Sequence, residues 1–93
     1  MTAIPAAERG AHQALTRRVI AAAAIRESAD GFVFELPAAE YDAVALFVAK
    51  ERLCCPFLTF VVTVRADERP VEMRVIGPAA AKDFIRAELH LPL

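Results

Sequence analysis

Two short runs of alternating apolar residues, separated by a polar turn, restrict the fold of this 93-residue chain more than any other feature. The alternating positions are Leu58, Phe60, Val62 and Val64 in the first run, FLTFVVTVR, and Val71, Met73 and Val75 in the second, VEMRVI. A period of two places such residues on one face of an extended strand. The segment ADERP between the runs predicts a turn, so we expect two antiparallel strands.

A second pair of strands is indicated by the segment SADG, which has the composition of a hairpin turn. We expect strands at about 20–27 and 32–36 on either side of it, and Pro37 ends the second strand. The alanines at 21–24 also favour a helix, which leaves the first of these strands ambiguous. The second strand places Phe32, Phe34 and Leu36 on one face, alternating with Val33 and Glu35.

Three helices complete the pattern, at about 5–18, 38–54 and 77–89. Pro5 suits the first position of the first helix. The second helix is predicted to have an apolar face that Cys55 continues, made of Tyr41, Val44, Ala45 and Val48. The third helix is predicted to turn three residues toward the core, Phe84, Ile85 and Leu89.

The order helix-strand-strand-helix-strand-strand-helix predicts an α+β fold, a two-layer sandwich with a four-stranded, largely antiparallel sheet. A chain of this length is expected to form a single domain over residues 1–93. We divide this domain into an N-terminal helical arm at 1–19 and a core at 20–93.

Charge and hydropathy argue against two classes of partner. The formal net charge is −1, and no basic cluster is larger than the pair Arg17 and Arg18, so nucleic-acid binding is disfavoured. No apolar run approaches the ~20 residues of a membrane span. Residues 1–12 lack the basic and apolar regions of a signal peptide, so we expect a cytoplasmic protein whose cysteines stay reduced.

The segment ERLCCPF, residues 51–57, contains the only two cysteines of the chain, Cys54 and Cys55. Pro56 cannot extend the preceding helix, so the cysteines are expected at its end. Glu51 lies one turn earlier, on the core side of this helix, where an unpartnered carboxylate would be costly. It could accept a hydrogen bond from a thiol or a backbone N–H, act as a general base, or be a third ligand for a soft ion.

Electrostatics favour a ligand that brings its own positive charge. The carboxyl end of a helix carries partial negative charge and Glu51 adds more, which disfavours a thiolate at Cys54 or Cys55. Thiophilic ions such as Hg²⁺, Cu⁺ or trivalent arsenic deprotonate the thiol themselves. We therefore predict a soft metal or metalloid site with Cys54, Cys55 and Glu51 as ligands. His12 and His90 are far away in the sequence and are expected on the surface, and two thiols alone do not make a tetrahedral zinc site.

Residues of about 40–88 resemble a bacterial module with the hallmark E-x-x-C-C-P-F, followed by an alternating strand pair and a Pro-containing helix. The matching positions are Glu51, Cys54, Cys55, Pro56, Phe57 and Phe60. The module resembles small stand-alone bacterial proteins and the C-terminal segment attached to some MerR-type transcriptional regulators. This chain has no helix-turn-helix region, so DNA binding does not follow. Association with metal-responsive relatives implies an effector-sensing role.

Three functions remain open, and binding of a soft metal, a metalloid or a thiol-reactive small molecule at Cys54 and Cys55 ranks first. A structural dimerisation module, in which the cysteines only pack, ranks second. A thiol-dependent enzyme, with one cysteine as nucleophile and Glu51 as base or acid, ranks last, because no oxyanion-type glycine loop and no nearby histidine supports it.

A homodimer is expected because the outer face of the predicted sheet carries few strongly polar residues. This face would hold Val33, Thr59, Val61 and Thr63, with the alanines at 21–24 beside them. The outer face of a solvated antiparallel sheet is normally more polar. We expect a second copy of the chain to cover the sheet face or to contact the N-terminal helix.

Overall fold

The computed structural model describes residues 4–92 and confirms the predicted α+β fold and its element order. Its helices are α1 (Ala6–Ala22), α2 (Tyr41–Cys54) and α3 (Ala81–Glu88), and a single 3₁₀ turn, η1 (Ala38–Glu40), precedes α2. Its strands are β1 (Ala24–Ser28), β2 (Gly31–Leu36), β3 (Thr59–Thr63) and β4 (Val71–Ile76).

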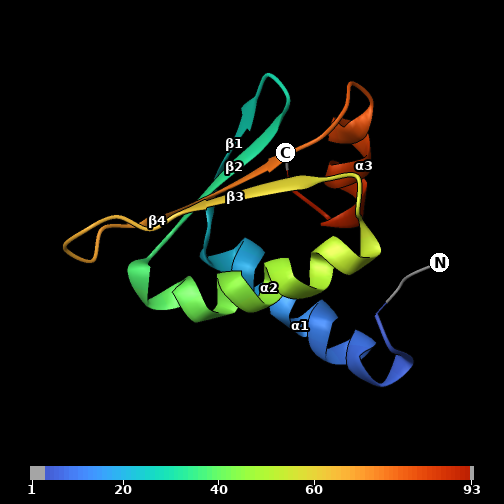
Figure 1. Ribbon diagram of the computed structural model, residues 1–93, viewed down its shortest axis with the longest axis horizontal. Coiled ribbons are helices and arrows are strands. Elements are labelled where there is room, and N and C mark those ends of the chain that lie inside the picture. The colour runs from blue at the N-terminus through green and yellow to red at the C-terminus, as the bar shows by residue number, and fades with distance from the viewer. Residues whose placement is uncertain (1–3, 93) are drawn as a thin grey trace.

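The four strands form one sheet in the order β1-β2-β4-β3, and each neighbouring pair is antiparallel. Gly31 opens β2 against β4 at a point where a Cβ atom would collide with the carbonyl oxygen of Val75, so only glycine fits there. The helices lie on one side of the sheet, with α1 packed along α2 and α3 near the end of α2 (Figure 1). Among residues 4–92, no helix or strand covers the opposite face of the sheet or the free edge of β3 (Figure 1).

The core lies between the helices and the inner face of the sheet. It is built from Phe32, Phe34, Met73 and Val75 of the strands, Val44 and Phe47 of α2, Ile85 of α3 and Val19 of α1. The strand residues in this set are those that the alternating pattern placed on one face. Burial of these side chains orients the end of α2 toward the end of α3.

The boundary between the first helix and the first strand differs from the prediction. Helix α1 continues to Ala22, and β1 begins only at Ala24, so a strand starting at about residue 20 is wrong. The alanine-rich stretch follows its helical propensity because α1 packs against α2 and buries Val19 completely.

The buried faces of α2 and α3 are also rotated from their predicted positions. In α2 the buried residues are Ala43, Val44, Phe47 and Glu51, whereas Tyr41 and Ala45 are exposed. In α3 Ile85 is buried as expected, but Phe84 is 39% exposed and stacks edge-on against Phe57. Tyrosine is a weak marker of a core face because it is only intermediate in burial, and alanine buries too little side-chain surface to decide which side of a helix faces the core.

The outer face of the sheet is more charged than the sequence suggested. Arg26, Val33, Arg74 and Val61 lie side by side across the four strands, in one row of paired residues. The adjacent row on the same face contains Glu35 of β2 opposite Glu72 of β4. Glu72 also forms an ion pair with Arg26, with 3.8 Å between the charged groups. The expectation of a mainly apolar outer face is therefore wrong, because it left these charged positions out.

Candidate metal centre

Helix α2 ends at the cysteine pair, as the position of Pro56 predicted. The backbone N–H of Cys55 donates to the carbonyl oxygen of Glu51 at 2.9 Å and closes the last helical turn. Cys55 itself has left the helical conformation, with a φ of −126°. Both cysteines are free thiols; Cys54 is half-buried and Cys55 is fully buried.

A third donor comes from the end of α3. The sulfur atoms of Cys54 and Cys55 and a carboxylate oxygen of Glu88 all lie within 4.8 Å of one another. The Cys54 thiol donates to Oε2 of Glu88 across 3.7 Å. Metal–sulfur bonds are about 2.3 Å long, so two donors on one ion are at most about 4.6 Å apart. Small side-chain movements therefore suffice to bring all three donors onto one ion.

Glu51 lies behind this group and is almost completely buried, with 2% of its surface exposed. Its Oε2 accepts a hydrogen bond from the Cys55 thiol at 3.5 Å, which is one of the partnerships that its position in the sequence allowed. Its Oε1 lies 2.7 Å from Nε2 of His12. The two contacts explain how a carboxylate is held inside the protein.

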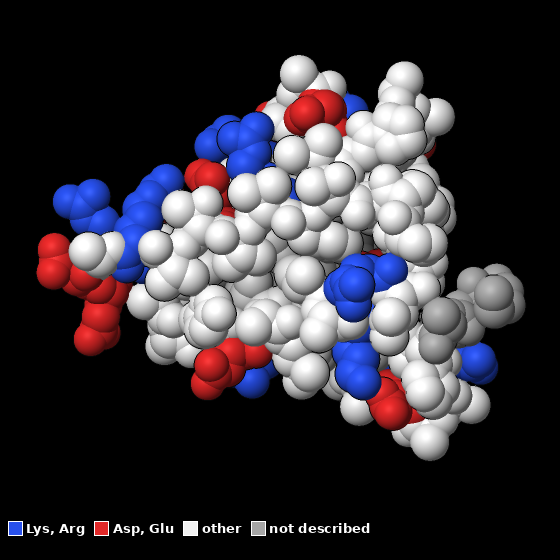
Figure 2. All heavy atoms as spheres, viewed as in Figure 1, with Lys and Arg blue, Asp and Glu red and all other residues white. Residues whose placement is uncertain are grey.

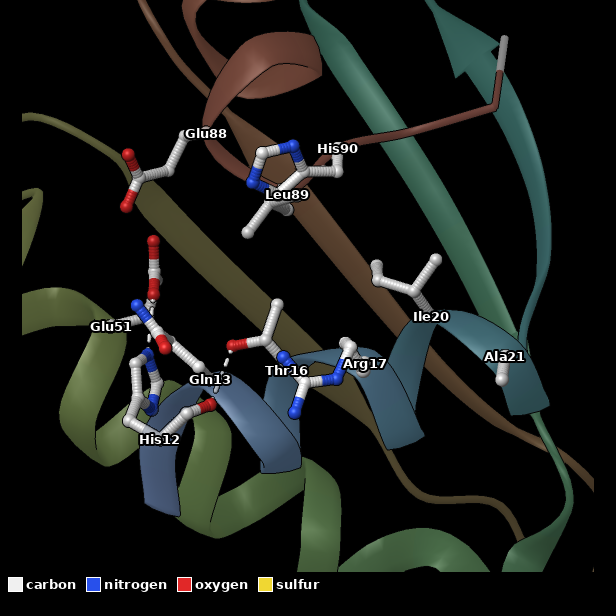
Figure 3. Close-up of a pocket in the computed structure, with 10 residues that line it drawn as sticks. All are labelled: His12, Gln13, Thr16, Arg17, Ile20, Ala21, Glu51, Glu88, Leu89 and His90. Carbon is white, nitrogen blue, oxygen red and sulfur yellow. Dashed lines mark hydrogen bonds and ion pairs between the residues drawn. The ribbon is translucent and has the colours of Figure 1, made fainter. Parts of the chain in front are cut away.

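His12 is not the surface residue that the sequence suggested. Its side chain is only 10% exposed and stacks on Phe47, with ring centroids 5.7 Å apart. The contact with Glu51 joins α1 to α2 and is drawn as a dashed line in Figure 3. The other ring nitrogen, Nδ1, is buried and has no hydrogen-bond partner within residues 4–92. His12 was missed because the packing of α1 on α2 cannot be inferred from the spacing of two distant residues.

Cys54, Cys55, Glu51 and Glu88 form a cluster in which burial and neighbouring charge both oppose negative charge. The pKa of the Cys55 thiol is raised strongly, first by burial and then by the Glu51 carboxylate beside it. The pKa of Glu88 is also raised, first by burial and then by Glu51. Burial and the Glu51 carboxylate therefore disfavour the ionised forms of Cys55 and Glu88, and a cation bound beside them would offset both effects.

A cleft of about 700 Å³ opens next to the cluster. Glu51 and Glu88 line one part of it, and in Figure 3 their carboxylates point toward one another from α2 and α3. The remainder of the wall comes mainly from α1 and from the residues that follow α3, including Arg17 and His90. The cleft therefore reaches the carboxylates of Glu51 and Glu88, which contact the thiols of Cys55 and Cys54 respectively.

The structure brings together most of the residues that the sequence singled out and adds two more. Cys54, Cys55 and Glu51 lie in one cluster, with Glu51 in contact with Cys55 rather than in the three-donor group. Glu88 and His12 complete the cluster. The one indication in the sequence was the expected place of Glu51 on the core side of its helix, because a carboxylate there needs buried partners.

Comparison with known protein families, with curated proteins and with solved structures found no match for this chain. Within residues 4–92, no helix is both long and apolar enough to cross a membrane.

Proposed function

We propose that this protein binds one thiophilic metal or metalloid cation through Cys54, Cys55 and Glu88, with Glu51 as an adjacent carboxylate. The observation that carries the proposal is the group of two thiols and one carboxylate oxygen within 4.8 Å of one another. Thiolate ligands select soft or borderline cations such as Cu⁺, Zn²⁺, Cd²⁺ and Hg²⁺ over hard ones. The three donors leave one coordination position open for a further ligand.

The electrostatics of the cluster support a cation more than a catalytic thiol. The raised pKa of Cys55 keeps this residue protonated and therefore a poor nucleophile. A bound cation reverses the situation, because its positive charge stabilises two thiolates and offsets the negative charge of the nearby carboxylates. Binding is therefore expected to release protons and to become tighter as the pH rises.

The resemblance to E-x-x-C-C-P-F modules supports a sensing or sequestering role in the cytoplasm. Such a role needs a reversible soft-ion site and no catalytic base. DNA binding is not part of the proposal, because the regulators' helix-turn-helix region has no counterpart in this sequence.

Titration of the reduced protein with Cd²⁺ tests the proposal, because cadmium–thiolate bonds give an ultraviolet charge-transfer band. We expect one equivalent to bind and the double variant Cys54→Ser/Cys55→Ser to lose the band. Glu88→Gln is expected to weaken binding about tenfold, the scale at which single supporting groups act in metal sites. Glu68→Gln removes the same charge from the exposed β3–β4 turn and is expected to leave binding unchanged.

The result that would overturn the proposal is equally direct. If the wild-type protein takes up no Cd²⁺, Zn²⁺ or Hg²⁺ in competition with a small dithiol, the cysteine pair has a packing role. Equal effects of Glu88→Gln and Glu68→Gln would remove Glu88 from the ligand set.

A further inference from the structure

The cleft beside the metal centre is larger and chemically more varied than a bare ion requires. Its volume of about 700 Å³ lies within the range of small-molecule sites, about 300–1,000 Å³. One end carries the carboxylates of Glu51 and Glu88. The rest of the wall combines polar with apolar side chains, namely Gln13, Thr16, Arg17 and His90 with Ile20, Ala21 and Leu89. Such a wall suits an organic molecule rather than a hydrated ion.

Arg17 is the one arginine or lysine in the wall of this cleft, and it is exposed. It forms no ion pair within the part of the chain that the structure describes, whereas its neighbour Arg18 contacts Glu40 at 3.0 Å. An unpaired guanidinium is a strong binder of carboxylates, because it donates two parallel hydrogen bonds. Arg17 is therefore available for an anionic group of a ligand in the cleft.

The spacing along α1 sets the size of such a ligand. His12, which contacts Glu51, and Arg17 are five residues apart, which corresponds to roughly 7.5 Å along a helix. A molecule with a short carbon chain spans this distance. One of its ends would meet the carboxylates next to the cysteines, and the other would meet the guanidinium (Figure 3).

We propose that the cleft admits the metal as a complex with a small thiol that carries a carboxylate. The cation of the complex meets Glu51 and Glu88 on its way to Cys54 and Cys55, while the carboxylate of the small thiol binds Arg17. This inference rests on the proposed function, since it names the form in which the same cation arrives. The apolar wall at Ile20 and Leu89 accommodates the carbon chain of the thiol.

Transfer is a ligand exchange without a change in oxidation state. Each protein cysteine forms one bond to the metal, and one bond between the metal and a small thiolate breaks. The proton of the cysteine passes to the departing thiolate, which leaves as a neutral thiol group. Two such steps move the cation from two small thiols to Cys54 and Cys55.

A matched pair of cadmium complexes tests this inference. Mercaptopropionate and mercaptopropanol have the same chain length, and only the first has a carboxylate. We expect wild-type protein at limiting concentration to take Cd²⁺ from the mercaptopropionate complex about tenfold faster, the scale of a charge-assisted hydrogen bond. Arg17→Ala should abolish this preference, Arg18→Ala should retain it, and both should bind free Cd²⁺ as the wild type does.

Equal transfer rates from the two complexes in the wild type would overturn the inference and leave the metal site standing. The inference is also overturned if Arg17→Ala and Arg18→Ala change the preference equally, because the general positive charge of this part of α1 would then explain the preference. If the wild type binds Cd²⁺ neither from solution nor from either complex, the metal site is wrong and this inference fails with it.

Discussion

Cys54 and Cys55 are neighbours in the sequence but have different surroundings. Cys54 is half-buried and faces Glu88, whereas Cys55 is fully buried against Glu51. Burial excludes both water and reagents from Cys55, and the adjacent carboxylate disfavours its thiolate. The two thiols are therefore expected to differ in reactivity, although both are proposed ligands of one ion.

We predict that iodoacetamide modifies Cys54 at least about tenfold faster than Cys55 at pH 8, because only a thiolate that the reagent can reach reacts. Because the pKa of Cys55 is raised, its alkylation should become appreciable only well above the pH at which an ordinary thiol ionises. Glu51→Gln removes the adjacent charge and should move this pH dependence to lower pH, with a several-fold faster reaction. Peptide mass spectrometry after timed quenching measures each cysteine separately.

Glu68→Gln is the control for this series, because it removes a carboxylate from an exposed turn. Equal rates at the two cysteines would contradict the different burial. A pH profile of Cys55 that Glu51→Gln leaves unchanged would limit Glu51 to the role of hydrogen-bond acceptor.

At the residue scale, the sequence located the cluster but not all of its members. Glu51, Cys54 and Cys55 are separated by one helical turn, so their proximity follows from helix geometry alone. His12 and Glu88 join through packing between helices, which depends on side chains along the whole contact. Local spacing carries no information about such contacts.

Among the elements, α1 has a large influence on the candidate site. It carries His12 and Arg17, and it is held against the core by Val19, which is fully buried. Lys50 of α2 also pairs with Glu8 of α1 at 2.5 Å. The position of α1 therefore decides whether the cleft and the partner of Glu51 exist at all.

We predict that Val19→Ala lowers the free energy of unfolding by about 1–3 kcal/mol, because it removes two buried methyl groups and leaves a cavity. Val64→Ala makes the same change at a position that is 61% exposed and should cost less than about 0.5 kcal/mol. Urea denaturation followed by circular dichroism measures both. If the two variants are equally stable, α1 is not anchored through Val19.

Strands β2, β3 and β4 were predictable because their apolar patterns agree with their turn residues, and the end of α2 was predictable from Pro56, although the buried face of α2 was not. The first strand was not, because the alanines at 21–24 fit a helix as well as a strand, and packing on α2 decided between them. The start of the last helix at Ala81 rather than at residue 77 has a local reason: Gly77 and Pro78 lie in the turn before the helix.

At the scale of the whole molecule, β3 and the outward side of α2 form a second surface that no other element covers within residues 4–92. β3 is an edge strand whose sequence, TFVVT, contains no charge, and such edges readily pair with another chain. The neighbouring outward face of α2 exposes Leu46 and Leu53, 52% and 41% of their surfaces respectively. Figure 2 shows mainly uncharged atoms across this region, with basic side chains in its right-hand part and further charged side chains around it.

We therefore keep the prediction of a homodimer but place its contact at the edge of β3 and the outer side of α2, rather than at the charged sheet face. Two copies of β3 can pair antiparallel about a two-fold axis at Val61, which sets Thr59 of each copy opposite Thr63 of the other. A stable protein–protein contact buries about 800 Å² on each partner, which is about one seventh of the 5512 Å² surface of this chain. A single strand edge is too small for this area, so β3 and α2 must both take part.

Lysine substitutions test this arrangement. Val61→Lys brings two positive charges together at the axis, and Leu46→Lys places a charge in the α2 contact, so each should yield monomers. Ala79→Lys adds the same charge in the exposed turn before α3 and should remain dimeric. Light scattering at tens of micromolar protein measures the mass of each variant.

A wild type that is monomeric under these conditions contradicts the dimer itself. A Leu46→Lys variant that stays dimeric while Val61→Lys dissociates would confine the contact to the strand edge or the adjoining sheet face, and α2 would then lie outside it.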